Sequence, residues 1–94
     1  PTNITFDNEG SEIHTIIEIE TRDRLGLLYD LAKTLSDNYI SISSAIIATF
    51  GEQAVDTFYV KDLFGLKLHS LSKREKLEHK LKEAIQAGTL IDPY

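Results

Sequence analysis

The hydrophobic period changes along the chain, and this change constrains the fold more than any other feature of the sequence. Mostly apolar residues occupy every second position from Ile13 to Glu20 and again from Ile40 to Phe50, which is typical of strands with one buried face. Between these segments the spacing becomes helical. One apolar stripe begins after Gly26 and consists of Leu27, Leu28, Leu31, Ala32 and Leu35. We therefore predict a strand, a helix and a strand in this order.

Further segments are predicted to add strands. Residues 51–53 have the composition of a hairpin connection, and they lead into a β-branched and aromatic run at 54–60. Residues 66–68 could extend the sheet briefly. A short alternating piece at about residues 3–7 precedes a turn-like cluster, and we expect it to form an edge strand.

A second helix is predicted from residue 72 onward. Ser72 is followed three residues later by Glu75, which is the spacing of a capping box. The predicted buried stripe consists of Leu77, Leu81, Ala84 and Ile85. Gly88 is placed to end the helix in a left-handed conformation.

The order of elements (ββαββα) predicts an α+β sandwich of the ferredoxin-like class. We expect a four-stranded antiparallel sheet with both helices on one face, and the early strand at the sheet edge. The chain should form a single domain over residues 1–94, with a core at 13–87 and a C-terminal tail at 88–94. Because position 1 is not methionine, we expect the chain to be part of a longer protein.

Charge and composition argue against several classes of function. The chain has 15 acidic and 10 basic residues and a net charge of −5, which argues against nucleic-acid binding. It contains no cysteine, which excludes disulfides and thiolate nucleophiles. No apolar run approaches the roughly 20 residues that a membrane span needs, so no membrane association is expected. The three histidines lack metal-ligand spacing, and no metal site or catalytic residue is predicted.

The segment from Asp23 to Leu28 is the strongest candidate site. It joins the end of a strand to the start of a helix, where the first amide N–H groups have no helical partner. With the positive end of the helix dipole, these groups can bind a carboxylate, and Gly26 lets a ligand approach the backbone. Asp23 would then hold a ligand ammonium group. The alternative is structural, with Asp23 as the helix N-cap and Gly26 as a turn residue.

Asp56 is a second candidate. It shares a strand face with Phe58 and Val60, so its carboxylate could point inward or lie at the sheet edge. The alternative is a solvated carboxylate beside a hairpin.

The segment from Arg22 to Leu31 (RDRLGLLYDL) resembles the ligand loop of ACT domains, in which D-R-x-G-L-L follows a strand and opens a helix. A longer segment, Ala45 to Gly65, more specifically resembles the ACT domains of bacterial uridylyltransferases that modify the PII signal-transduction protein. The resemblance covers about residues 3–87. It departs at Leu25, where the family usually has a proline that would restrict φ, so we expect a less preorganised loop.

This resemblance implies a regulatory domain that senses an amino acid, with glutamine as the expected effector. Catalysis, with Mg²⁺ as the expected cofactor, would belong to other domains of a cytoplasmic parent enzyme that acts on PII; no cofactor is expected in this domain. A homodimer, or pairing with another ACT copy, is also implied. The ligand-binding residues expected are Asp23, Arg24, Leu25, Gly26, Leu27, Leu28, Ala45, Ile46 and Asp56.

Other functions stay open at this level. A dimerisation or interdomain-contact module with no ligand of its own is the main alternative. A small hydrolase of ferredoxin-like fold would need a convergent set of polar groups, for which Arg22 and Arg24 are thin support. An RNA-binding sandwich would stack bases on sheet aromatics such as Phe50 and Phe58, but the glycine-rich basic motif of that class is missing.

Overall fold

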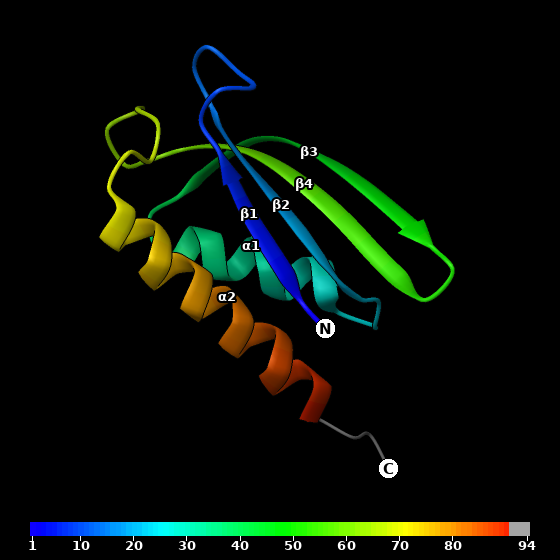
Figure 1. Ribbon diagram of the computed structural model, residues 1–94. Coiled ribbons are helices and arrows are strands. Elements are labelled where there is room, and N and C mark those ends of the chain that lie inside the picture. Colours follow the sequence, from blue (N-terminus) through cyan, green and yellow to red (C-terminus); the bar gives the residue numbers. More distant parts are fainter. Residues whose placement is uncertain (91–94) are drawn as a thin grey trace.

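The computed structural model describes residues 1–90, with side chains described through residue 88. Its elements follow the predicted ββαββα order (Figure 1). They are β1 (Asn3–Asp7), β2 (Thr15–Arg22), α1 (Leu27–Asp37), β3 (Ser41–Phe50), β4 (Gln53–Lys61) and α2 (Leu71–Leu90).

The four strands form one antiparallel sheet in the order β1-β2-β4-β3. Both helices lie on the same face of this sheet (Figure 1). The predicted fold class is therefore confirmed, and so is the position of the early strand, because β1 lies at the sheet edge beside β2. The central strands β2 and β4 pair over eight residues, with Ile17 opposite Phe58.

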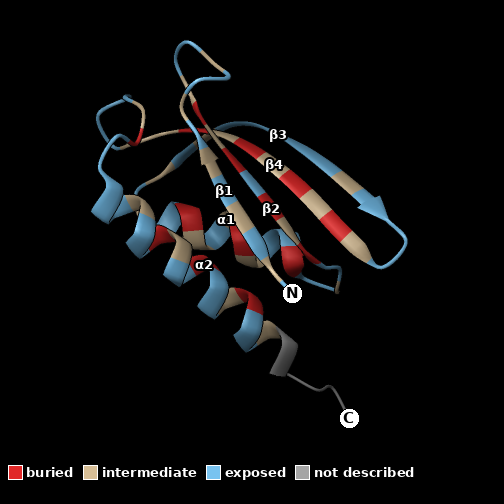
Figure 2. Ribbon diagram, in the orientation of Figure 1, coloured by how far each residue is buried: buried red, intermediate tan, exposed pale blue. Residues whose placement is uncertain are grey.

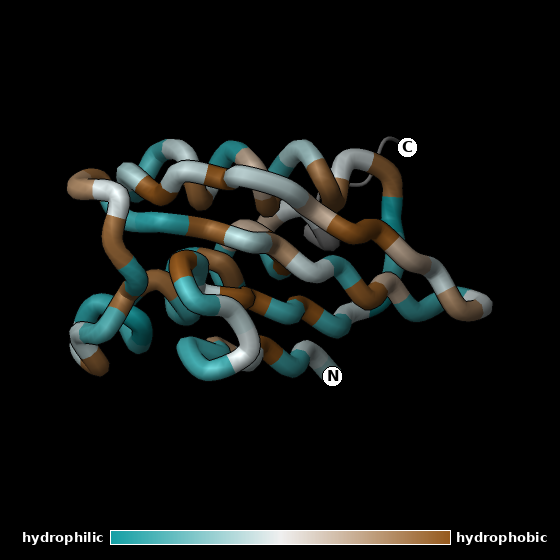
Figure 3. Tube along the Cα trace, turned by 90° about the horizontal axis from the view of Figure 1, so that it is seen from above, coloured by the Kyte–Doolittle hydropathy of each residue, from teal (hydrophilic) through white to brown (hydrophobic). Residues whose placement is uncertain are grey.

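The core lies between the sheet and the two helices. Side chains alternate along each strand, so every second residue of β2 and β4 points toward the helices and is buried (Figure 2). The same alternation appears as brown and teal bands along the strands in Figure 3. The buried apolar residues are Ile17, Ile19, Leu27, Leu31, Leu35, Ala54, Phe58, Val60, Leu68, Leu77, Leu81 and Ile85.

A bulge in β3 alters the predicted face of this strand. The pairing with β4 shifts between Ile42 and Ser44, and one extra residue in a strand moves the following side chains to the opposite face. Ile42 therefore packs against the core, whereas Ile46 lies opposite Thr57, on the face away from the helices. The period-two pattern predicted one continuous face from residue 40 to 50, and that prediction is wrong.

The start of α2 differs from the prediction. The helix begins at Leu71, and the Ser70 hydroxyl accepts a hydrogen bond from the amide of Lys73 at 3.3 Å. Ser70 is therefore the N-cap, and the capping box predicted from Ser72 and Glu75 is not the cap that forms. Residues 66–68, predicted as a possible strand, lie in the loop before this helix.

The end of α2 also differs. Gly88 lies inside the helix, which continues to Leu90, and it is not among the glycines with positive φ. The predicted left-handed termination at Gly88 is therefore wrong, and the predicted tail from residue 88 is helical at least to residue 90. Residues 91–94 of that tail lie outside the described residues.

Candidate ligand-binding site

The loop between β2 and α1 is held by backbone hydrogen bonds. The amide of Asp23 donates to the carbonyl of Glu52 in the β3–β4 turn at 2.7 Å, and the amide of Leu27 donates to the carbonyl of Arg24 at 3.2 Å. The N-cap of α1 is Gly26, with no side-chain cap hydrogen bond. The structural alternative, in which Asp23 caps the helix, is therefore wrong.

Gly26 adopts φ 80°, in the left-handed region that favours glycine. Space is not the reason for this glycine, because a Cβ there would meet only Arg24 Nη1, at 3.7 Å. The backbone conformation is the reason. It leaves the first turn of α1 without a side-chain cap, and the amides of Leu28 and Tyr29 have no hydrogen-bond partner within residues 1–90.

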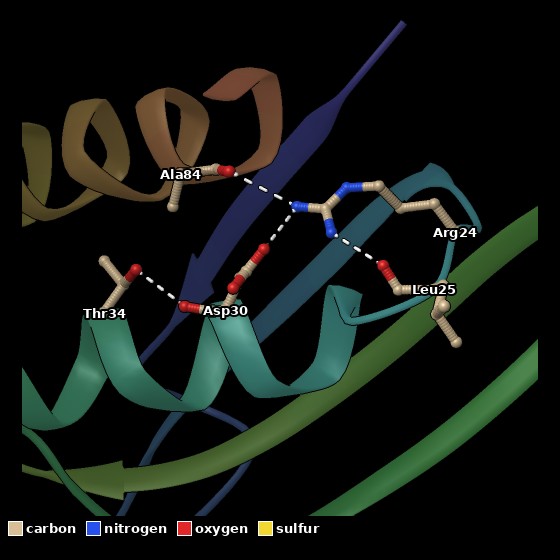
Figure 4. A network of polar contacts seen from close by, with 5 residues as sticks. All are labelled: Arg24, Leu25, Asp30, Thr34 and Ala84. Atoms are coloured by element: carbon tan, nitrogen blue, oxygen red, sulfur yellow. Dashed lines mark hydrogen bonds and ion pairs between the residues drawn. The ribbon is translucent and has the colours of Figure 1, made fainter. Parts of the chain in front are cut away.

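Arg24 ties this loop to both helices (Figure 4). Its Nη2 donates to Asp30 Oδ2 at 2.7 Å and to the carbonyl of Ala84 in α2 at 3.3 Å, and its Nη1 donates to the carbonyl of Leu25 at 3.0 Å. The Arg24–Asp30 ion pair is largely shielded from solvent. Arg24 therefore positions the loop, and its terminal nitrogens are already engaged.

The close approach of Arg24 explains the glycine inside α2. A Cβ at Gly88 would overlap Nη2 and Cζ of Arg24. A side chain at this position would have to displace the guanidinium group from its contacts. Gly88 therefore leaves room for the guanidinium group of Arg24 against α2 and does not terminate the helix.

An open cleft of about 920 Å³ lies at this end of the two helices. Asp23, Arg24, Leu25 and Gly26 of the predicted site line it together, and Leu25 is fully exposed. The other lining residues are Pro1, Thr2, Thr21, Arg22, Asp30, Lys82, Ile85, Gln86 and Gly88. Two predicted residues of the same loop segment are not part of this lining: Leu27 is buried in the core, and Leu28 is half exposed.

Asp56 is buried on the core face of β4, with 2% of its surface exposed. The alternative of a solvated carboxylate is therefore wrong. Burial raises the pKa of its carboxyl group, the negative charge of Asp23 raises it further, and the backbone amide of Ala48 acts in the opposite direction. Asp56 Oδ1 has no hydrogen-bond partner among the described residues. Asp56 therefore lies close enough to the loop to sense its charge, although it does not line the cleft.

Ala45 and Ile46 lie on β3, at the edge of the sheet. Neither residue lines the cleft at the β2–α1 loop. Within one copy of the chain the structure therefore brings together the loop residues and leaves these two apart.

Sequence reasoning missed the contribution of α2 to the cleft. Asp30 could have been suspected as an acidic residue in the first turn of a helix. A glycine in a helical stripe, such as Gly88, can indicate close approach of another group. Nothing in the sequence indicates Lys82 or Gln86, because only the packing of α2 against α1 brings them to the loop.

Residues 1–90 contain neither a metal-binding cluster nor a membrane-spanning helix. No group of three or more histidine, cysteine, aspartate or glutamate residues there could hold a metal ion. No helix in that range is both long and apolar enough to span a bilayer.

Residues 3–91 match the family model described as an ACR9-like, ACT-like domain. The chain belongs to the ACT-like domain family. The domain is also similar to bifunctional uridylyltransferase/uridylyl-removing enzymes. It is 65% identical over 88 residues to that of Cereibacter sphaeroides and 64% identical over 88 residues to that of Ruegeria pomeroyi. Each alignment covers 94% of the chain and 10% of the relative. The ACT-like domain thus spans about a tenth of the length of these relatives.

A solved structure of an unknown protein from Galdieria sulphuraria resembles the ACT-like domain with a TM-score of 0.59 and 17% sequence identity. The match covers 74% of this chain and 37% of that one. At this identity the likeness shows the fold alone.

Proposed function

We propose that this ACT-like domain is an amino-acid-sensing regulatory module that binds glutamine at the β2–α1 loop. The observation that carries the proposal is the uncapped start of α1, which opens beside a cleft that also contains an aspartate. The free amides of Leu28 and Tyr29 follow Gly26, which lines the cleft, and together with the helix dipole they favour a carboxylate. Asp23, exposed on the same cleft, offers a negative charge for an ammonium group.

This combination suits a zwitterion better than a simple anion. A free α-amino acid carries a carboxylate and an ammonium group a few bonds apart, so both charges can be met at once. Arg24 would act as a positioning residue, because its contacts with Asp30 and Ala84 hold the loop against the helices. The amide-bearing side chain of glutamine would extend into the cleft beside Gln86 and Lys82.

The names of the relatives support a role for this module as part of a larger enzyme. The two relatives are named bifunctional uridylyltransferase/uridylyl-removing enzymes, and this domain corresponds to about a tenth of their length. In our proposal, a cytoplasmic parent enzyme of this kind adds UMP to the PII protein or removes it, according to whether the domain holds glutamine. The ACT-like domain itself contributes no catalytic group.

Isothermal titration of the chain with glutamine tests the proposal, with glutamate and serine as controls. We expect saturable binding of glutamine only. Asp23→Asn should weaken binding about tenfold, because a charge-assisted hydrogen bond is lost. It should leave the unfolding free energy nearly unchanged, since Asp23 makes no capping contact. Intact glutamine affinity in Asp23→Asn would eliminate the ammonium role of this residue.

A dimerisation module without a ligand is the second candidate, and one observation favours it. Ile46 and Phe50 on the edge strand β3 are 59% and 68% exposed. Such an apolar edge invites pairing with another strand. A dimer that fails to bind glutamine in the titration would support this alternative.

A further inference from the structure

A second pocket, of about 480 Å³, lies at the other ends of both helices, away from the β2–α1 loop. The end of α1, the loop after β4 and the start of α2 surround it. The residues that line it are Asn38, Tyr39, Ile40, Asp62, Leu63, Phe64, Leu66, Lys67, Leu68, His69, Ser70, Lys73, Lys76 and Leu77. Its size falls within the range of small-molecule sites.

The walls of this pocket are largely apolar. Leu68 and Leu77 belong to the buried core, and Ile40 packs against that core. Around them, Phe64 and Leu66 are mostly exposed. An apolar pocket that continues into exposed apolar side chains can take the hydrocarbon part of a ligand.

The loop that closes the pocket is held in place before any ligand binds. Asp62 Oδ1 accepts hydrogen bonds from the amides of Phe64 at 2.8 Å and Leu66 at 2.9 Å. Asn8 also contacts this loop. Its side-chain Nδ2 donates to the Leu68 carbonyl at 3.0 Å, and its backbone carbonyl accepts a hydrogen bond from Lys67 Nζ at 2.6 Å. Such preorganisation lowers the entropic cost of binding.

The charge at the pocket is opposite to the charge of the chain. The chain carries a net charge of −5, yet the lining includes three lysines and a single acidic residue, Asp62. The carboxylate of Asp62 is engaged by the loop amides. Lys73 and Lys76 are exposed and have no ion-pair partner within the described residues, unlike Lys82, which pairs with Glu78. The positive end of the α2 dipole lies at the same place.

Tyr39, which follows the end of α1, also lines this pocket. It is the one non-glycine residue with positive φ (61°) in the described part of the chain, and its place in the C-terminal turn of α1 accounts for that conformation.

We propose that this pocket binds a small monocarboxylate with an apolar body, such as a short alkyl carboxylate. The hydrocarbon part lies against Leu68 and Leu77, and the carboxylate faces Lys73, Lys76 and the start of α2. The site differs from the amino-acid site at the β2–α1 loop, because it offers cations and no free carboxylate for an ammonium group.

Chemical-shift mapping by ¹⁵N NMR tests this proposal with three probes that share one alkyl chain: hexanoate, 1-hexanol and hexylammonium. We expect saturable shifts at Tyr39, Leu66 and Leu77 with hexanoate. Hexanol should bind more weakly, and hexylammonium should not saturate. Added salt should weaken the binding of hexanoate.

Charge-neutralising variants test whether Lys73 and Lys76 in particular bind the carboxylate. Lys73→Gln combined with Lys76→Gln should weaken hexanoate binding about tenfold, since each exposed charge contributes modestly. Lys80→Gln is the control, because Lys80 is exposed on the same helix and does not line the pocket. It should leave hexanoate affinity unchanged.

Three results would overturn the proposal. Hexanol binding as tightly as hexanoate would show an apolar patch without a carboxylate site. Hexanoate shifts confined to other surfaces would show that the pocket is not the binding site. A loss of hexanoate affinity in Lys80→Gln as large as in the double variant would show that Lys73 and Lys76 have no specific role. Glutamine titration reports on the other end of the helices, so failure of one proposal leaves the other standing.

Discussion

Asp56 places a carboxyl group on the core face of β4, between Ile19 of β2 and Ile47 of β3 in the sheet register. Burial and the charge of Asp23 raise its pKa above the ordinary value. Between the ordinary pKa and this raised pKa, the folded chain holds more protons than the unfolded chain. The contribution of Asp56 to stability is therefore full at low pH and is lost as the pH rises through its raised pKa.

Asp56→Asn should remove this pH dependence. Above its raised pKa we expect the variant to be more stable than the unchanged chain by about 1 kcal/mol, because a buried charge with an unpartnered oxygen is removed. The difference should shrink as the pH falls toward and below the ordinary pKa of 3.8, where Asp56 becomes protonated in both the folded and the unfolded state. Urea unfolding of both proteins across this range measures it. A difference that is constant with pH would contradict the assignment.

Arg24 and Gly88 form the second residue-level test, because the guanidinium group occupies the space of a Cβ on Gly88. Gly88→Ala should stabilise α2 by up to about 1 kcal/mol in an Arg24→Ala background, since alanine is the better helix former. With Arg24 present, the gain should be smaller or negative, because the methyl group displaces Arg24 from Asp30 and Ala84.

A double-mutant cycle of urea unfolding measures this coupling. We expect an interaction energy of at least about 0.5 kcal/mol between the two positions. If Gly88→Ala changes the unfolding free energy equally with and without Arg24, the contacts of the Arg24 guanidinium group do not depend on a glycine at position 88.

At the level of elements, α1 ends in a Schellman motif with an unusual residue. The amide of Ile40 donates to the carbonyl of Leu35 at 2.9 Å, and that of Tyr39 donates to Ser36 at 3.0 Å. This motif places Tyr39 at the left-handed position where glycine is common.

Tyr39→Gly should therefore stabilise the domain by about 1 kcal/mol, which is the order of the left-handed penalty. A domain of this size would gain roughly 4–8 °C in melting temperature. Tyr39→Ala is the control, because it removes the ring and keeps the penalty, and it should show no gain. Calorimetry measures both, and equal gains would assign the effect to loss of the ring.

The helices and strands also show which parts of the fold were predictable from the sequence and which were not. The helix at Leu27–Asp37 and the ββαββα order of elements were predictable because period and turn signals agree with the packing. The bulge between Ile42 and Ser44 was not, because an inserted residue leaves no mark in a run of serine and isoleucine. The cap at Ser70 was missed because Ser72 fits a stronger local motif. The choice between the two serines depends on where the preceding loop ends and the helix begins, and this is set by tertiary packing.

For the site, sequence identified the residues that are contiguous along the chain. Asp23 to Gly26 meet in the cleft because they follow one another in one loop. The cleft wall from α2 was unpredictable, since 60 residues separate Arg24 from Ala84 and only tertiary packing joins them. Ala45 and Ile46, named from family resemblance, lie on the free edge of the sheet. Their relation to a ligand therefore depends on assembly.

At the level of the whole molecule, the exposed edge strand β3 is the surface most suited to pairing with another chain. It is a ten-residue edge strand whose apolar residues are exposed on both faces: Ile46 points away from the helices and Ile47 toward their side. The β3–β4 hairpin extends beyond the helices in Figure 1, which leaves this edge uncovered. A long, apolar, uncharged edge strand is a template for pairing with another strand.

We therefore expect a two-fold homodimer formed through β3, with Ile46, Ile47 and Phe50 at the interface. Light scattering at tens of micromolar should give about twice the 10.6 kDa mass of the chain. Ile47→Lys should yield a monomer, because a lysine on an edge strand opposes pairing. Thr5→Lys is the matched control, since it places the same charge on the opposite edge strand, β1, and should leave the dimer intact. If glutamine affinity falls together with dimerisation in Ile47→Lys and persists in Thr5→Lys, the β3 edge completes the ligand site. A monomeric unchanged chain at these concentrations would refute the prediction.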